Sequence, residues 1–304
     1  MMVKKRTMAV CAGLVGGGMM LAASASALDI NVSLGLFGGD SSRDRTADAF
    51  SALKFGKAKN VILFIGDGMG DSEITIARNY EKGAAGRLSM DALPLTGEYT
   101  TYAVKEGTPA TPDYVPDSAA TGTAWATGKK TYNNGVSVDP VTYKPVRTIL
   151  ELAQQAGFKT GNVTTSELTD ATPAVLDSHI TRRGCQGPLD CGQIGETVEF
   201  DKSVKVALDW ATTHPDTLIV VTADHGHTAQ IIEPGSTSPG RVVTVTPKEG
   251  QPMMINDATS TGSSQSHTGT EVRIAAQGPQ AANVLGITDQ TDLFHTLGRA
   301  LGVE

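Results

Sequence analysis

Two stretches of this sequence place acidic and imidazole side chains just after apolar runs. Asp67 comes just after the run Asn60–Ile65. Asp224 and His225 come just after the run Thr217–Thr222. Two carboxylates and one imidazole are suitable oxygen and nitrogen ligands for Zn²⁺, with a coordination position left open. The alternative is that these are ordinary loop residues, with Asp67 held in a tight turn between glycines.

A serine at the start of a small-residue segment is a second candidate. Asp117 and Ser118 follow Pro116, and small residues then continue to Gly128, as a helix packed closely against a sheet requires. Unpaired N–H groups and the helix dipole favour an anion at such a helix start. Ser118 is therefore either a helix N-cap or a nucleophile, and Asp117 would lie beside it. Because the sequence has no Gly-x-Ser-x-Gly elbow, a neighbouring metal ion would have to activate the nucleophile.

Three further signals suit metal or phosphate binding but have ordinary alternatives. Asp170 and Thr172 offer hard oxygen ligands of the kind that Mg²⁺ prefers, or form a capped turn before a helix. His267 follows a loop rich in Ser, Thr and Gly and is a candidate ligand, although a lone loop histidine is more often unliganded. Arg183 offers bidentate recognition of a phosphate, or is a solvated surface charge.

Apolar runs that alternate with helical patterns indicate the fold class. Strand-like segments are 60–65, 158–164, 217–222 and 271–276, a hairpin is expected over 241–255, and helix-like segments are 146–156, 199–213 and 289–301, the last with Thr288 as N-cap. This alternation predicts a doubly wound, mostly parallel α/β sheet with helices on both faces. Ligands bind outside the carboxyl ends of the strands in such sheets. Asp67, Asp224 and His225 should therefore meet on one rim.

The first 27 residues have the pattern of a secretory signal peptide. Lys4–Arg6 is basic, Met8–Leu21 is apolar but too short to span a bilayer, and Ala25–Ala27 is a small-residue cleavage site. We therefore expect a mature chain of residues 28–304 that is periplasmic or secreted, without a stable membrane anchor. The formal net charge of -7 at pH 7 argues against nucleic acid as a partner.

Taken together, the motifs resemble those of bacterial periplasmic alkaline phosphatases. The matching stretches occur in the family's order and cover nearly the whole mature chain, namely Asn60–Gly70, Pro116–Ala124, Thr169–Pro173, Thr222–His227, His267–Gly269 and 273–301. The resemblance implies an alkaline phosphatase-like catalytic domain over residues 28–304. It also implies hydrolysis of small phosphate monoesters, two Zn²⁺ ions, one Mg²⁺ ion and a homodimer.

The resemblance assigns roles to the catalytic and first metal-binding residues. Ser118 matches the nucleophile that forms a phosphoseryl intermediate, and Arg183 matches the group that clamps the phosphate. Asp67, Asp224 and His225 match the protein ligands of the zinc ion that activates the serine.

The resemblance also assigns the remaining metal ligands. Asp67 matches a residue that bridges to the Mg²⁺ ion, which Asp170 and Thr172 also bind. His267 matches one ligand of the other zinc ion, which handles the leaving group and the attacking water. His227 matches a neighbour of that second zinc site.

The stretch between Cys185 and Cys191 departs from the family pattern. The family continues here through a long segment with a central strand, a magnesium-binding Glu, and an Asp and a His for the leaving-group zinc. We therefore expect an internal deletion near residues 186–191, of roughly 100–150 residues, and a sheet that lacks a central strand. The two cysteines either form a short disulfide or are two thiols that have each lost their usual partner.

This departure leaves one zinc site complete and the other two metal sites incomplete. Because a two-metal centre stabilises both the attacking and the leaving oxygen, losing one ion should lower the rate by several orders of magnitude. The first functional hypothesis is a phosphomonoesterase of the alkaline phosphatase type. The alternatives are a non-catalytic or misfolding-prone fragment that binds one zinc ion and phosphate, and a related metal-dependent phosphodiesterase or sulfatase.

Overall fold

The structure is a computed structural model that describes residues 45–176, 192–258 and 265–304 of the chain. The chain separates into two units, Met1–Ala47 and Asp48–Glu304, and the second unit carries the fold described below. The short helix α2 (Thr46–Ala52) spans the boundary. Several predicted features lie outside the described residues, namely the signal peptide over 1–27, Arg183, Cys185, Cys191 and the junction near 186–191.

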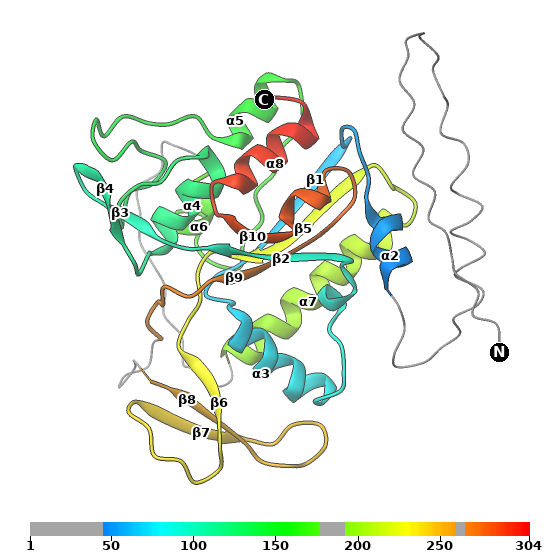
Figure 1. The fold of residues 1–304 in the computed structure, drawn as a ribbon, viewed down its shortest axis with the longest axis vertical. Helices are drawn as coiled ribbons and strands as arrows, with labels where there is room; N and C mark the ends of the chain where they lie inside the picture. Colours follow the sequence, from blue (N-terminus) through cyan, green and yellow to red (C-terminus); the bar gives the residue numbers. More distant parts are fainter. Residues whose placement is uncertain (1–44, 177–191, 259–264) are drawn as a thin grey trace, which may run out of the picture. The chain divides into compact units, whose positions relative to one another are not determined.

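The main sheet of the second unit has five strands in the order β1-β5-β9-β2-β10 (Figure 1). The strands are β1 (Asn60–Gly66), β2 (Leu95–Thr100), β5 (Thr217–Ala223), β9 (Val272–Gln277) and β10 (Gly286–Asp289). β1 pairs with β5 in parallel, and so does β2 with β10, whereas β9 is antiparallel to both of its neighbours. Four of the five strands therefore run in the same direction, and the predicted mostly parallel sheet is confirmed.

Helices lie on both faces of this sheet, as predicted (Figure 1). One group comprises α4 (Ser118–Thr127), α5 (Ile149–Gln155), α6 (Ala171–Ala174) and α8 (Asp292–Leu301), and the other comprises α3 (Asp71–Lys82) and α7 (Gly192–Ala211). No helix within the described ranges is long and apolar enough to cross a membrane.

Two smaller antiparallel sheets and two 3₁₀ turns complete the described elements. One small sheet pairs β3 (Ala103–Lys105) with β4 (Thr108–Asp113). The other has the order β6-β8-β7 and consists of β6 (Ala229–Ile232), β8 (Met253–Asp257) and β7 (Arg241–Val245). The 3₁₀ turns are η1 (Ser89–Ala92) and η2 (Ala281–Val284). β7 and β8 form the hairpin that the sequence predicts over 241–255.

β5 is the central element of the hydrophobic core, and β1 is not. Every residue of β5 is buried, and its apolar side chains belong to the largest apolar cluster. β1 has an equally apolar sequence, but six of its seven residues are only partly buried. Within the described residues, β1 pairs with β5 alone, so its other edge is open. An open edge of this kind is what the loss of a neighbouring strand would leave.

Two sequence-based assignments of elements are wrong. The segment Phe158–Thr164 is not a strand: it pairs with no other described strand, and Val163 is 99% exposed. Thr288 lies in β10 instead of capping the last helix, which begins at Asp292 with Thr291 as its N-cap. The Asp289 side chain accepts a hydrogen bond from the Thr291 N–H at 2.9 Å, and this turn separates the strand from the helix.

Candidate active site

The ends of β1 and β5 bring the first group of candidate ligands together. The two strands pair in register up to Gly66 opposite Ala223, so that Asp67 and Asp224 leave the sheet at the same level. One ligand atom from each of Asp67, Asp224 and His225 lies within 4.8 Å of the other two. The strand-end argument therefore places these side chains correctly.

Asp224 is completely buried and held by backbone groups. Its Oδ1 accepts hydrogen bonds from the N–H groups of Gly68, at 3.0 Å, and His225, at 2.9 Å. Burial and the neighbouring Asp67 carboxylate raise the pKa of Asp224 to about 6. The two carboxylates repel one another in their ionised form, so a cation between them would stabilise the pair. This donor set fits a divalent metal ion.

Ser118 lies at the edge of this group because α4 begins there. Asp117, and not Ser118, is the N-cap: its Oδ1 accepts a hydrogen bond from the Ala120 N–H at 2.9 Å. The N-cap interpretation of Ser118 is therefore wrong, and its hydroxyl is directed elsewhere. Ser118 Oγ lies 3.0 Å from His225 Nε2 and 3.5 Å from Asp67 Oδ2.

Thr172 also reaches the carboxylates, whereas Asp170 does not. The Thr172 hydroxyl lies 3.1 Å from Asp67 Oδ2 and 3.2 Å from Asp224 Oδ2. Asp170 caps the short helix α6, and its Oδ1 accepts a hydrogen bond from the Ala171 N–H at 2.8 Å. For Asp170 the structure matches the capped-turn alternative, and its carboxylate belongs to neither group of candidate ligands in the described part of the chain.

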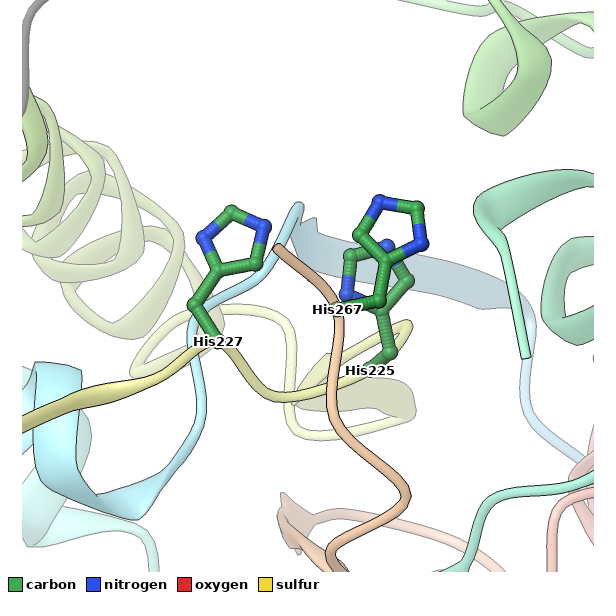
Figure 2. A group of neighbouring side chains, drawn as sticks. All are labelled: His225, His227 and His267. Atoms are coloured by element: carbon green, nitrogen blue, oxygen red, sulfur yellow. The ribbon is translucent and has the colours of Figure 1, made fainter. Parts of the chain in front are cut away.

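Three histidines form a second group of candidate ligands beside the first (Figure 2). The ring centroids of His225 and His267 are 3.9 Å apart, those of His225 and His227 5.3 Å, and those of His227 and His267 5.8 Å. Burial, and next the neighbouring His225, lower the pKa of His227 to about 4 and also lower that of His267. These shifts favour the neutral form of both rings, which is the form that binds metals. His225 belongs to both groups.

Glu73 is a buried residue of this region that the sequence analysis does not single out. It lies in the first turn of α3, is 2% exposed, and accepts a hydrogen bond from the Ala229 N–H at 3.1 Å. Burial raises its pKa to about 7. The contact joins α3 to the segment that carries His227. An acidic residue in a first helical turn is common, so its position gives no signal of this role.

Comparison with known proteins identifies the family. The sequence model of the alkaline phosphatase family matches residues 58–193, 189–255 and 238–303, which together cover most of the chain. The chain belongs to the alkaline phosphatase family. It is accordingly a metal-binding phosphomonoesterase by family, and its fold agrees with that assignment.

Individual relatives agree with this family. Alkaline phosphatase of Escherichia coli (strain K12) is 34% identical over 424 aligned positions, covering 86% of this chain and 90% of that protein. Streptomycin-6-phosphate phosphatase of Streptomyces griseus is 32% identical, covering 81% and 91%. The solved structure of alkaline phosphatase from the Antarctic bacterium TAB5 has a TM-score of 0.61 at 21% identity, covering 82% of this chain and 99% of that one, which is a likeness of fold.

The alignments also show how this alkaline phosphatase differs from its relatives in length. The alignment with the Escherichia coli protein has 424 positions, but 86% of 304 residues is about 261, so about 160 positions have no counterpart here. The segments matched by the family model overlap at residues 189–193 and again at 238–255, and the first overlap includes part of the junction predicted near 186–191. The difference in length supports a shortened chain, and the position of the shortening near 186–191 stays a prediction.

Proposed function

We propose that this alkaline phosphatase hydrolyses small phosphate monoesters with Ser118 as its nucleophile. The observation that carries the proposal is the position of Ser118 Oγ, 3.0 Å from His225 Nε2 and 3.5 Å from Asp67 Oδ2. The serine therefore lies next to the atoms that would hold a metal ion. We also propose that Asp67, Asp224 and His225 hold a Zn²⁺ ion there.

The orientation of His225 supports its role as a ligand. Its Nδ1 lies 3.3 Å from the Gly226 carbonyl oxygen, which can only accept a hydrogen bond. The proton of a neutral ring is therefore on Nδ1, and the lone pair is on Nε2, which faces Ser118 and the two carboxylates. When bound, a Zn²⁺ ion would lower the pKa of the serine hydroxyl and so generate a stronger nucleophile.

The protein groups themselves would bind and orient the substrate. In the proposed reaction Ser118 Oγ gives up its proton to solvent and forms a bond to phosphorus while the bond from phosphorus to the leaving oxygen breaks, and that oxygen takes a proton from water to leave as the alcohol. A water oxygen then forms a bond to phosphorus while the bond to Ser118 Oγ breaks, so that the serine regains a proton and phosphate is released. The N-terminus of α4, with its helix dipole, favours the phosphate charge, and the Asp117 cap fixes the turn that carries Ser118. Arg183 is proposed as the phosphate clamp, although it lies in a part of the chain that the structure does not describe.

We infer that the remaining metal positions of the family are incomplete here. His267 would be the only matched ligand of the leaving-group zinc, and Thr172 the hydroxyl ligand of Mg²⁺, which lacks its Glu. We therefore propose that turnover is several orders of magnitude below that of complete relatives. A non-catalytic fragment that binds one zinc ion and phosphate is the second candidate, and the open edge of β1 favours it.

The proposal has consequences for location and assembly. We propose that residues 1–27 direct the chain to the periplasm or outside the cell, and that residues 28–304 form a homodimer. Cys185 and Cys191 would then meet an oxidising environment, in which they form a short disulfide or stay unpaired.

The proposed nucleophile is tested by activity. The chain is expressed in a periplasm, and hydrolysis of a chromogenic phosphate monoester is measured above pH 8 with and without added Zn²⁺ and Mg²⁺. We expect metal-dependent turnover that Ser118→Ala removes and the exposed control Ser203→Ala preserves. Undiminished turnover in Ser118→Ala would disprove the role of Ser118. A wild-type chain that binds zinc and phosphate without turnover would support the second candidate instead.

A further inference from the structure

We propose that His225, His227 and His267 form a three-histidine site for a borderline divalent ion such as Zn²⁺ or Co²⁺, which competes with the Asp67–Asp224–His225 group for that ion. The inference deepens the proposed function and rests on it through His225, which both groups contain. The three histidines would hold the ion because the leaving-group zinc site lacks its other ligands.

The local backbone places the three rings on one face. Gly226 and Thr268 form an antiparallel bridge, in which the Thr268 N–H donates to the Gly226 carbonyl at 3.0 Å. Side chains alternate between the two faces of such a bridge, so the residues on either side of a bridged residue share a face. His225 and His227 flank Gly226, and His267 precedes Thr268. Figure 2 shows the three rings on the same side of these two backbone segments.

Additional contacts keep His227 and His267 in place. The Thr268 hydroxyl donates to the His227 carbonyl at 3.1 Å, which ties the two segments together a second time. Gly68 lies directly against the His227 ring, because a Cβ added at Gly68 would overlap it. The Glu73 carboxylate holds the next part of the same segment through the Ala229 N–H. The rings of His227 and His267 are consequently almost parallel, with an interplanar angle of 7°.

The chemistry of the two groups differs. Three imidazole nitrogens suit Zn²⁺, Co²⁺, Ni²⁺ or Cu²⁺ and leave a coordination position open, whereas Mg²⁺ prefers oxygen ligands. Asp67 and Asp224, with the Thr172 hydroxyl, supply oxygen atoms instead. His225 Nε2 is 3.6 Å from Asp67 Oδ1 and 3.4 Å from Asp224 Oδ2, and one nitrogen lone pair binds one ion. An ion held by the three histidines therefore removes His225 from the carboxylate group.

The ligand count of the bound ion tests this directly on the unmodified chain. One equivalent of Zn²⁺ is added to the purified protein in Mg²⁺-containing buffer, and X-ray absorption counts the imidazoles around the zinc. We expect three imidazoles. A count of one imidazole with oxygen ligands would overturn the three-histidine site.

Variants identify which histidines bind. His227→Gln and His267→Gln should each raise the Zn²⁺ dissociation constant, measured in competition with a chromophoric chelator, by at least about tenfold. Each should also lower the imidazole count. His214→Gln is the matched control, since that ring stacks on Trp210 away from the site and its loss should change neither quantity. Asp224→Asn should leave the count at three. Unchanged affinity in both His227→Gln and His267→Gln would contradict the proposal.

The outcome is separable from that of the proposed function. Ser118→Ala removes the proposed nucleophile and no ligand of the three-histidine site, so the imidazole count should stay at three. If the zinc has three imidazoles and turnover survives Ser118→Ala, the three-histidine site is supported and the role of Ser118 as nucleophile is disproved. If the zinc has one imidazole and turnover depends on Ser118, the role of Ser118 is supported and the three-histidine site is disproved. Circular dichroism of each metal-free variant shows whether that variant is folded. The imidazole count of the unmodified chain does not depend on the folding of any variant.

Discussion

At the residue scale, individual side chains can be placed from the sequence when a strand end or helix start fixes their backbone. Asp67 and Asp224 meet because β1 and β5 end in register. Ser118 reaches His225 because α4 begins at the serine while Asp117 caps it. The proximity of His227 and His267 is predicted only through the family resemblance, since it depends on a bridge and a hydroxyl hydrogen bond between segments that lie about 40 positions apart. Neither segment has a regular pattern that predicts this pairing.

The packing of Gly68 against His227 gives the first prediction. Gly68 has a φ of +64°, and a Cβ there would overlap the His227 ring. Gly68→Ala should therefore lower the free energy of unfolding through backbone strain, about 1 kcal/mol, and through overpacking, about another 1–3 kcal/mol. The matched control is Gly56→Ala, with a φ of +87° and no atom within 4 Å of the added Cβ. Equal losses for the two variants in urea unfolding would refute the close contact with His227.

The cap of α4 gives the second prediction. Asp117 Oδ1 accepts from the Ala120 N–H, and Oδ2 accepts from the Asn134 N–H at 2.7 Å. Asp117→Ala removes both acceptors, so we expect a loss of about 2 kcal/mol in the free energy of unfolding. Asp117→Asn keeps one acceptor oxygen and should recover part of the loss. An alanine variant as stable as the unmodified chain would contradict the capping role.

At the element scale, the sequence predicts an element correctly where the apolar or small residues of its pattern are also the buried residues. The apolar run of β5 is fully buried, and the small residues of α4 pack inside the protein. The segment Phe158–Thr164 has a similar strand-like pattern but forms no strand. The prediction is wrong there because a sequence pattern does not show whether a partner strand is present. Lys130 directly follows another lysine in the sequence, yet its side chain is only 11% exposed and its ammonium group lies over the Tyr102 ring.

A partly buried ion-pair cluster that joins three elements gives the third prediction. Asp91 of η1 accepts from Arg78 of α3 and Arg273 of β9, each at 2.7 Å. Burial opposes ionisation of Asp91, but the hydrogen bonds from the two arginines outweigh it and hold its pKa well below the ordinary range. Because the folded pKa is lower than the unfolded one, the cluster stabilises the protein fully above about pH 4 and loses this effect as the pH falls further.

Substitution of Asp91 tests this pH dependence. Asp91→Asn should lower the free energy of unfolding by about 3 kcal/mol at pH 7, since it leaves two partly buried arginines without their partner. The difference between the variant and the unmodified chain should shrink as the pH is lowered from 5 to 3. Asp216→Asn, which removes the exposed pair with Lys59, is the control and should have little effect at any pH. A difference that is independent of pH would contradict the account.

At the scale of the whole molecule, the fold is consistent with the predicted internal shortening. Two segments of the family match overlap at residues 189–193, and about 160 positions of the alignment with the Escherichia coli protein have no counterpart in this chain. In the part of the chain that the structure describes, β1 is an apolar strand that pairs with β5 alone. The loss of a strand is predicted only through the family resemblance, since neither composition nor periodicity reveals an absent segment. An apolar edge strand with unpaired backbone groups is a site for pairing with another chain.

The open edge gives the fourth prediction. Hydrogen exchange of the β1 amides should slow as the protein concentration rises, because the edge pairs between chains. β10 lies at the opposite edge of the same sheet but has a short sequence with a glycine and an aspartate, so its exchange should not depend on concentration. Exchange of β1 that is independent of concentration would show that this edge does not associate.

The most direct test of the central claim is capture of the phosphorylated enzyme. The chain, supplied with Zn²⁺ and Mg²⁺, is mixed with a phosphate monoester and quenched in acid, and its peptides are mapped by mass spectrometry. We predict a phosphoryl group on Ser118 in the unmodified chain and none in a Ser118→Ala chain treated in the same way. Hydrolysis of the ester without any phosphoryl group on Ser118 would contradict the account.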